Sequence, residues 1–223
     1  MRADWDRRAR ENARYFIATG KESWSDEEFF ASGRRTVEET ILTDLSNICQ
    51  GKTPHDMRVL EIGCGAGRVT RALAEQFGEV HAVDVSGEMV AHAREALQSF
   101  ANAHVYQNNG MDLHVLPDLP FDFAFSFIVF QHIPDHQIVE NYLREVHRLL
   151  RPGGLFKFQV NGIANRSQGR KLLHRLRKTA DTWIGDPFSE EEMRNLAART
   201  GFECRHMAGA GTQYFWLWFF RDV

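Results

Sequence analysis

The feature that most constrains the fold is a short apolar run that passes through three closely spaced glycines into a helix-length segment. It spans residues 59–69, with the sequence Val-Leu-Glu-Ile-Gly-Cys-Gly-Ala-Gly-Arg-Val. Glycine lets the backbone approach a ligand closely, and the first turn of a helix presents N–H groups without intrahelical partners. In doubly wound α/β folds such a turn lies at the crevice beyond the carboxyl ends of the strands. The segment therefore predicts a strand, a tight turn and a helix that together form a ligand site.

The sequence after Met57 alternates short apolar runs with longer amphipathic segments, which is typical of a parallel sheet with helices on its faces. The predicted fold class is α/β: a doubly wound, mostly parallel seven-stranded sheet with helices on both faces and an antiparallel C-terminal strand pair. The glycine-rich residues 208–211 join that pair. We expect helices at 66–77, 87–99, 135–150 and 189–200, and strands at 57–62, 80–84, 104–107, 121–127, 154–160, 202–207 and 213–220.

Residues 1–50 are predicted to be helical and to precede the α/β domain. A first helix is expected from about Asp4 to Thr19, ending at a glycine. A second helix follows, because Ser25 and Glu28 have the spacing of a capping box and precede an apolar stripe. The predicted organisation is a helical lid or extension at 1–50 and one α/β domain at 51–223, with an insertion at about 162–186.

Composition narrows the functional classes. The formal charge of -3 and the pI near 6.4 supply no positive field for polyanions, so we expect no nucleic acid partner. The cysteines at 49, 64 and 204 are far apart, which disfavours a disulfide framework or a zinc site. We therefore expect a cytoplasmic protein without a bound metal. No stretch has the roughly 18 apolar residues of a membrane span, so no membrane association is expected.

A second motif agrees with the first. The apolar run that begins at Val80 ends in Asp84, and a carboxylate at this place can accept both hydroxyls of a ribose. Dinucleotide enzymes share this arrangement, but their glycine pattern is G-x-G-x-x-G. Here residues 61–67 read E-x-G-x-G-x-G. This spacing disfavours a nicotinamide cofactor, and an NAD(P)-dependent oxidoreductase is kept as the alternative.

Residues 61–67 resemble the first motif of the class I, Rossmann-like methyltransferase family, which has the form E/D-x-G-x-G-x-G. The resemblance covers roughly residues 57–160. It includes the run Phe-Asp-Phe-Ala-Phe-Ser at 121–126 and the later motif Leu-Leu-Arg-Pro-Gly-Gly at 149–154. The resemblance implies an S-adenosyl-L-methionine-dependent enzyme whose product is S-adenosyl-L-homocysteine.

The resemblance also implies the residues of the cofactor site. The glycine turn is expected to hold the amino-acid part of the cofactor, and Asp84 to bind the ribose. Val85 and Met89 are expected to flank the adenine, with Gly110 and Met111 beside it in the loop after the third strand. Tyr15 is the N-terminal aromatic residue most suited to cover the cofactor. The expected cofactor-binding residues are Glu61, Gly63, Cys64, Gly65, Gly67, Asp84, Val85, Met89, Gly110, Met111, Phe127 and Tyr15.

Methyl transfer from a sulfonium is an in-line displacement, so the protein mainly binds, aligns and desolvates. A hydroxyl acceptor also needs a base, and His132, which follows the fourth strand, is the candidate catalytic residue. A role in holding its loop together is the other interpretation of His132.

The predicted reaction transfers a methyl group to oxygen or nitrogen of a small molecule. A non-catalytic S-adenosylmethionine-binding module remains an alternative. The basic residues within 165–184 indicate either an anionic acceptor or a solvated helix face. Base-methylating enzymes resembling this family carry Asn/Asp-Pro-Pro-aromatic where residues 127–130 here read Phe-Ile-Val-Phe, so base methylation is disfavoured. The sequence does not identify the acceptor, the methylated atom or the oligomeric state.

Overall fold

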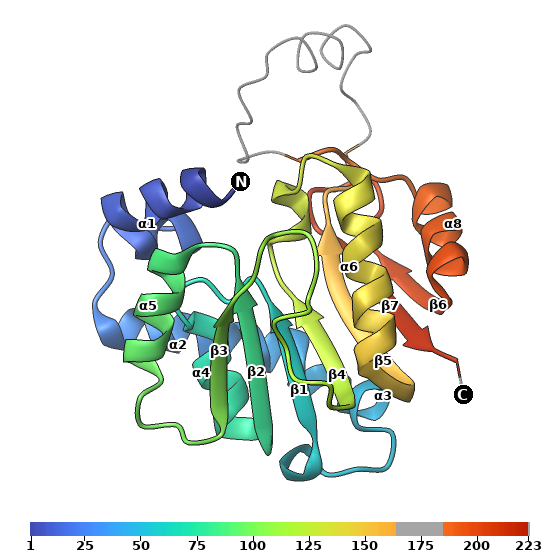
Figure 1. Ribbon diagram of the computed structural model, residues 1–223, viewed down its shortest axis with the longest axis horizontal. Helices are drawn as coiled ribbons and strands as arrows, with labels where there is room; N and C mark the ends of the chain where they lie inside the picture. Colours follow the sequence, from blue (N-terminus) through green and yellow to red (C-terminus); the bar gives the residue numbers. More distant parts are fainter. Residues whose placement is uncertain (164–184, 223) are drawn as a thin grey trace, which may run out of the picture.

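The computed structural model describes residues 1–163 and 185–222 and contains a seven-stranded sheet (Figure 1). The strand order is β3-β2-β1-β4-β5-β7-β6. The first five strands in sequence are parallel, whereas β7 runs antiparallel to both of its neighbours. The strands are β1 (Arg58–Ile62), β2 (Glu79–Asp84), β3 (Ala103–Gln107), β4 (Phe121–Ser126), β5 (Leu150–Val160), β6 (Phe202–Ala208) and β7 (Phe215–Arg221).

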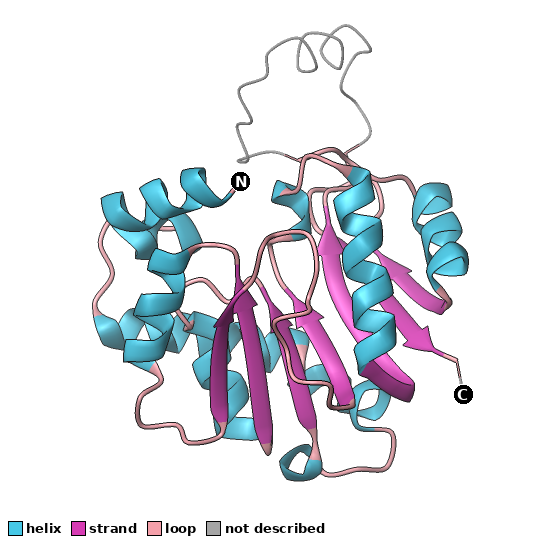
Figure 2. Cartoon of the chain, in the orientation of Figure 1, coloured by secondary structure: helices cyan, strands magenta, loops and turns pink. Residues whose placement is uncertain are grey.

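Helices cover both faces of the sheet (Figure 2). On one face α6 (His136–Leu149) and α8 (Glu190–Thr200) bury aliphatic side chains against the sheet. The other face is covered by α2 (Asp26–Thr40), α3 (Leu45–Cys49), α4 (Arg68–Gln76) and α5 (Gly87–Ala96). Within residues 1–163 and 185–222, the remaining helices are α1 (Arg2–Ile17) and three short 3-10 turns, η1 (Leu42–Asp44), η2 (Pro54–Asp56) and η3 (Phe130–His132).

The predicted fold class is confirmed, including the antiparallel C-terminal pair. The predicted capping box of Ser25 and Glu28 begins α2, and Ser189 and Glu192 form a second capping box at the start of α8. Among the described helices, none is both long and apolar enough to cross a membrane. The predicted insertion lies almost entirely outside the described residues, and its basic side chains lie outside them completely.

Most boundaries differ from the sequence prediction by one to three residues, and two differ by more. The second helix was expected to follow one apolar stripe to about residue 50, but α2 ends at Thr40. Its carbonyl accepts a hydrogen bond from the buried Lys157 ammonium at 2.5 Å, so this oxygen is directed toward the sheet. β5 begins at Leu150 instead of 154, because Leu150 already pairs with Phe121 before a register shift in the ladder.

α1 lies beyond the carboxyl ends of the parallel strands (Figure 1). It packs against α5, and Arg10 forms an ion pair with Glu88 at 2.9 Å. The hydroxyl of Ser86, which caps α5, donates to Asp6 at 2.6 Å. The N-terminal segment is thus held over the edge of the sheet where the glycine turn lies.

Candidate functional site

The glycine turn after β1 has the backbone that only glycine adopts readily. Gly63, Gly65 and Gly67 have φ angles of 78°, 53° and 82°. A Cβ atom on Gly63 would lie 2.2 Å from Cγ2 of Val129, and one on Gly65 would lie 2.8 Å from Cδ1 of Ile17. The loop after β4 and the end of α1 therefore close on the turn so tightly that a side chain at either glycine would displace Val129 or Ile17.

Asp84 joins the turn to the end of β2. Its Oδ2 accepts a hydrogen bond from the Gly65 amide, and its Oδ1 accepts one from the Ser86 amide, each at 2.9 Å. Burial raises the pKa of Asp84 above its usual value, and the hydrogen bonds from Ser86 and Gly65 oppose this shift. The carboxylate is thus fixed in orientation at the mouth of the crevice between β1 and β2.

A cavity opens at this place. The turn and the ends of β1 and β2 form its floor, and the loop after β4 forms one wall. Side chains of α1 close it on the opposite side. Its lining is Met1, Trp5, Phe16, Ile17, Glu61, Ile62, Gly63, Cys64, Gly65, Arg68, Val69, Val83, Asp84, Val85, Met89, Asn108, Phe127, Ile128, Val129, His132, Ile133 and Tyr142.

The cavity brings together most of the residues predicted for the cofactor site. The predicted residues that line it are Glu61, Gly63, Cys64, Gly65, Asp84, Val85, Met89, Phe127 and His132. These residues come from three segments that are distant in sequence, 61–65, 84–89 and 127–132, so their convergence supports the prediction that they serve one ligand. Their individual roles stay predictions.

Four predicted residues do not line the cavity. Gly67 is the N-cap residue of α4 and faces α5, where an added Cβ would lie 3.3 Å from the Cα of Ala93. Gly110 lies against Val85, and Met111 is 54% exposed. The ring of Tyr15 packs edge-on against Phe16, with centroids 5.2 Å apart, and Phe16 is the ring that lines the cavity.

Sequence reasoning missed several lining residues. Asn108 donates a hydrogen bond to the Tyr142 hydroxyl at 2.8 Å, while its own buried Oδ1 has no hydrogen-bond partner in the described structure. The sequence placed a loop here but gave no signal for which side chain points inward. Tyr142 lies on α6, where the helical period predicts only a core position.

Glu61 is 4% exposed, at the end of β1 beneath the turn. Burial raises its pKa to about 7, although a hydrogen bond from the Thr70 hydroxyl at 2.6 Å and the nearby Arg68 both oppose the shift. Near neutral pH the carboxyl is therefore divided between its two protonation states.

A second cavity adjoins the first. His132, 8% exposed, lines both cavities, and its ring packs edge-on against Trp5 at 5.4 Å. Ile128 in the shared wall has a φ of 56°, an unfavourable conformation for a β-branched residue. Six residues line both cavities: Phe16, Ile17, Arg68, Phe127, Ile128 and His132.

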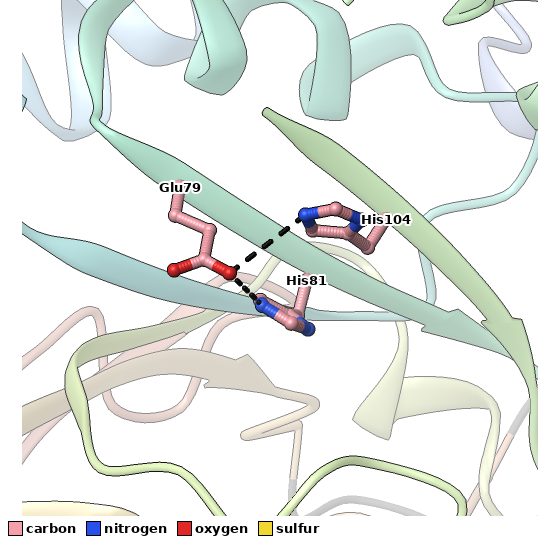
Figure 3. Close-up of side chains that lie close together, drawn as sticks. All are labelled: Glu79, His81 and His104. Atoms are coloured by element: carbon pink, nitrogen blue, oxygen red, sulfur yellow. Dashed lines mark hydrogen bonds and ion pairs between the residues drawn. The ribbon is translucent and has the colours of Figure 1, made fainter. Parts of the chain in front are cut away.

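A different group of ligand-type side chains lies on β2 and β3, away from the cavities (Figure 3). Oε1 of Glu79 lies 2.8 Å from Nε2 of His81 and 3.7 Å from Nε2 of His104. All three ligand atoms lie within 4.8 Å of one another, a spacing compatible with a metal ion. Glu79 also pairs with Arg58 at 2.7 Å, and this positive charge opposes a cation there. Together with Arg58 on β1, these side chains connect three neighbouring strands. That the protein binds no metal stays a prediction.

Comparisons with a family model, with known proteins and with solved structures all find methyltransferases. Residues 59–154 match a family model described as a methyltransferase domain. Phosphoethanolamine N-methyltransferase 2 of Caenorhabditis elegans is 30% identical over 146 residues, which are 65% of this chain and 32% of that protein. Trans-aconitate 2-methyltransferase of Azoarcus sp. (strain BH72) is 32% identical over 145 residues, which are 62% of this chain and 51% of that protein. The chain thus matches about one third to one half of the length of these relatives.

Solved structures share the fold over nearly the whole chain. Magnesium protoporphyrin IX methyltransferase from Synechocystis PCC 6803, crystallised with S-adenosylhomocysteine, superposes with a TM-score of 0.65 at 18% identity and covers 99% of this chain and 98% of its own. An S-adenosylmethionine-dependent methyltransferase from Clostridium acetobutylicum ATCC 824 gives a TM-score of 0.66 at 14% identity, covering 97% and 99%. With its complete first motif, its sheet order and its match to the family model over residues 59–154, the chain is similar to class I, Rossmann-like S-adenosylmethionine-dependent methyltransferases and shares their fold.

Proposed function

We propose that this protein is an S-adenosyl-L-methionine-dependent methyltransferase that transfers a methyl group to oxygen or nitrogen of a small molecule. One observation carries the proposal: the positive-φ glycine turn and the fixed Asp84 carboxylate face the same cavity. The family model and the relatives support the reaction class, and their printed names describe small-molecule acceptors of unlike chemistry.

The cavity fits the cofactor in chemistry. The Asp84 carboxylate suits the two ribose hydroxyls, because a carboxylate can accept both as hydrogen bonds. Val85 and Met89 supply an apolar surface suited to adenine. Gly63, Cys64 and Gly65 of the turn line the cavity, so their backbone is available to the cofactor. Gly67, Gly110, Met111 and Tyr15 stay predictions as contact residues.

The cofactor, when bound, supplies both the methyl group and its leaving group. The residues of this chain then have to align the acceptor and exclude water. Trp5 and Phe16 of α1 line the cofactor cavity from above and can exclude solvent. His132 lies where the two cavities meet, so it is placed to take a proton from an acceptor or to orient it.

The acceptor is proposed to bind in the second cavity. Aromatic rings and uncharged polar groups dominate its described lining, including Trp24, Tyr214, Gln131, Asn161 and Gln213. This composition suits a small organic molecule. We further propose a cytoplasmic location, in keeping with three free cysteines in the described structure, and a covering role for residues 1–50.

Ligand binding tests the cofactor. Calorimetry with S-adenosylhomocysteine is expected to give binding, whereas NADH and NADPH are expected to give none. Asp84→Asn keeps the side-chain shape but gives up one acceptor oxygen, so it should weaken S-adenosylhomocysteine binding by about 10- to 100-fold. Asp118→Asn, which changes an exposed carboxylate remote from the cavity, is the matched control.

Product detection tests the reaction. Incubation with S-adenosylmethionine and a metabolite extract should yield a species heavier by one methylene, identified by mass spectrometry. His132→Ala is expected to slow formation of this product while sparing S-adenosylhomocysteine affinity. Tight nicotinamide binding, or cofactor binding with no methylated product, would contradict the proposal.

A further inference from the structure

Arg68 is a buried guanidinium at the boundary of the two cavities. It is the first residue of α4, directly after the glycine turn, and is 7% exposed. It lines both the cofactor cavity and the second cavity. A charged side chain in such a place needs a counter-charge, because desolvating an unpaired ion is costly.

The described residues provide no counter-charge in direct contact. Nη1 of Arg68 donates only to hydroxyls, those of Thr36 at 3.0 Å and Ser32 at 3.3 Å. Nε is buried and has no hydrogen-bond partner, and no ion pair to Arg68 occurs within the described parts of the chain. The guanidinium therefore retains donor capacity within the site.

The two hydroxyls are held by their own helix. Ser32 donates to the carbonyl of Phe29 at 2.6 Å, and Thr36 donates to that of Ser32 at 3.1 Å. Their hydrogens are thus engaged, and their lone pairs accept from Arg68. Gly33 permits this arrangement, because a Cβ there would lie 2.0 Å from the Arg68 carbonyl oxygen. The close approach of α2 to α4 fixes the guanidinium in position.

No acidic side chain in the described lining of the second cavity balances the positive charge of Arg68. Ser32 and Thr36 line the second cavity only, and no aspartate or glutamate is among the described residues that line it. Glu61 is the acid that interacts electrostatically with Arg68, but it bonds to Thr70 and its pKa is about 7. Arginine stays protonated, so its positive charge faces the junction of the cavities without a direct counter-charge among the described residues.

We propose that Arg68 binds a carboxylate or phosphate group of a ligand at this junction. The proposal rests on the proposed function and deepens it. An anionic oxo group would satisfy the unused donors and neutralise the buried charge, which is the geometry that a guanidinium fork recognises. Two sources can supply the group: the amino-acid carboxylate of the cofactor, or an anionic methyl acceptor in the second cavity.

Arg68→Met tests the proposal, because methionine keeps the apolar stem and removes the fork. Arg71→Met is the matched control: it removes the same charge one turn further along α4, at a residue that lines neither cavity and packs over Phe30 at 4.6 Å. Calorimetry measures the affinity of each protein for S-adenosylhomocysteine and for 5′-methylthioadenosine, which lacks the amino-acid part. Melting temperatures are then recorded with inorganic phosphate or succinate, on the free proteins and on their S-adenosylhomocysteine complexes.

Two results support the proposal and separate the sources. A loss of about 10- to 100-fold in S-adenosylhomocysteine affinity in Arg68→Met, with 5′-methylthioadenosine unaffected, assigns the anion to the cofactor. Unchanged nucleoside affinities, with stabilisation by phosphate or succinate present in the wild type and Arg71→Met but lost in Arg68→Met, assign it to the acceptor.

The proposal is overturned if Arg68→Met matches the wild type in every one of these measurements. If Arg68→Met fails to fold, Arg68→Lys provides the same comparison, because lysine keeps the charge but lacks the planar guanidinium. The losses of ligand affinity and of stabilisation by anions are expected to be smaller in Arg68→Lys than in Arg68→Met. Failure of the wild type to bind either nucleoside would instead contradict the proposed cofactor, while the anion measurements on the free proteins would still test Arg68.

Discussion

Gly63 has a backbone conformation that favours glycine, and it also lines the proposed cofactor cavity. Its φ of 78° costs little for glycine, and its missing side chain lets Val129 close on the turn. The same absence leaves the backbone accessible from the cavity.

Gly63→Ala is expected to destabilise the protein by several kcal/mol and to abolish S-adenosylhomocysteine binding, because both the backbone conformation and the contact with Val129 become unfavourable. Urea denaturation and calorimetry measure the two effects. Gly51→Ala is the control: Gly51 has a φ of 91° but nothing within 4 Å of an added Cβ, so only the backbone term of about 1 kcal/mol should remain. Equal losses in the two variants would contradict the steric argument.

Single residues of the site differ in how well the sequence predicts them. The glycines and Asp84 were predicted because backbone geometry and ribose chemistry demand those residue types after a strand. Arg68 and Asn108 were not predicted as cavity residues, since their direction depends on how α2 and the loop after β3 pack. A sequence pattern gives the position of a side chain along an element, but not the neighbour that turns it inward.

At the scale of elements, the N-terminal extension is joined to the sheet through a buried charge pair. Lys157 on β5, 4% exposed, forms an ion pair with Asp44 of η1 at 2.6 Å. Trp218 on β7 donates to the same carboxylate at 2.6 Å. Burial alone would raise the pKa of Asp44, but these two hydrogen bonds hold it below its usual value.

Asp44→Asn is expected to lower the free energy of unfolding by about 3 kcal/mol, because the Lys157 ammonium is then buried without a counter-charge. The double variant Asp44→Asn with Lys157→Met should lose less than the sum of the two single variants. Glu75→Gln, which breaks the more exposed pair with Arg34, should cost no more than about 1 kcal/mol. Strict additivity in urea denaturation would show that the buried pair is not coupled.

The contacts of Lys157 also show which ends of the helices could be predicted from the sequence. Capping boxes and glycine stops are local signals, so the starts of α2 and α8 were predicted from their own residues. The end of α2 depends on Lys157, more than a hundred residues further on. No local pattern carries that contact, and the apolar stripe that continues to Ile48 indicated a longer helix.

At the scale of the whole molecule, the sheet buries an acid beneath the ligand site. Glu61 has a pKa of about 7 in the folded protein, against an ordinary value of 4.5. Between these pH values the folded state binds more protons than the unfolded state, so stability falls as the pH rises. The contribution of Glu61 is fully present below pH 4.5 and is lost as the pH rises through about 7.

Glu61→Gln, which mimics the protonated carboxyl, should remove this dependence. The free energy of unfolding of Glu61→Gln minus that of the wild type is expected to rise between pH 5 and pH 8 by an amount on the order of 1–3 kcal/mol. Urea denaturation at several pH values gives the difference, and comparison at each pH cancels the titration of other groups. A difference that stays constant from pH 5 to pH 8 would contradict the raised pKa.

The position of β7 between β5 and β6 has a consequence for how the sheet is completed. β6 precedes β7 along the chain, yet its only hydrogen-bonded neighbour among the described strands is β7. It therefore has no template until β7 has docked against β5. Until residues 215–221 have been synthesised and have docked, β5 is itself an edge strand, and its unpaired backbone groups are exposed to association with other chains.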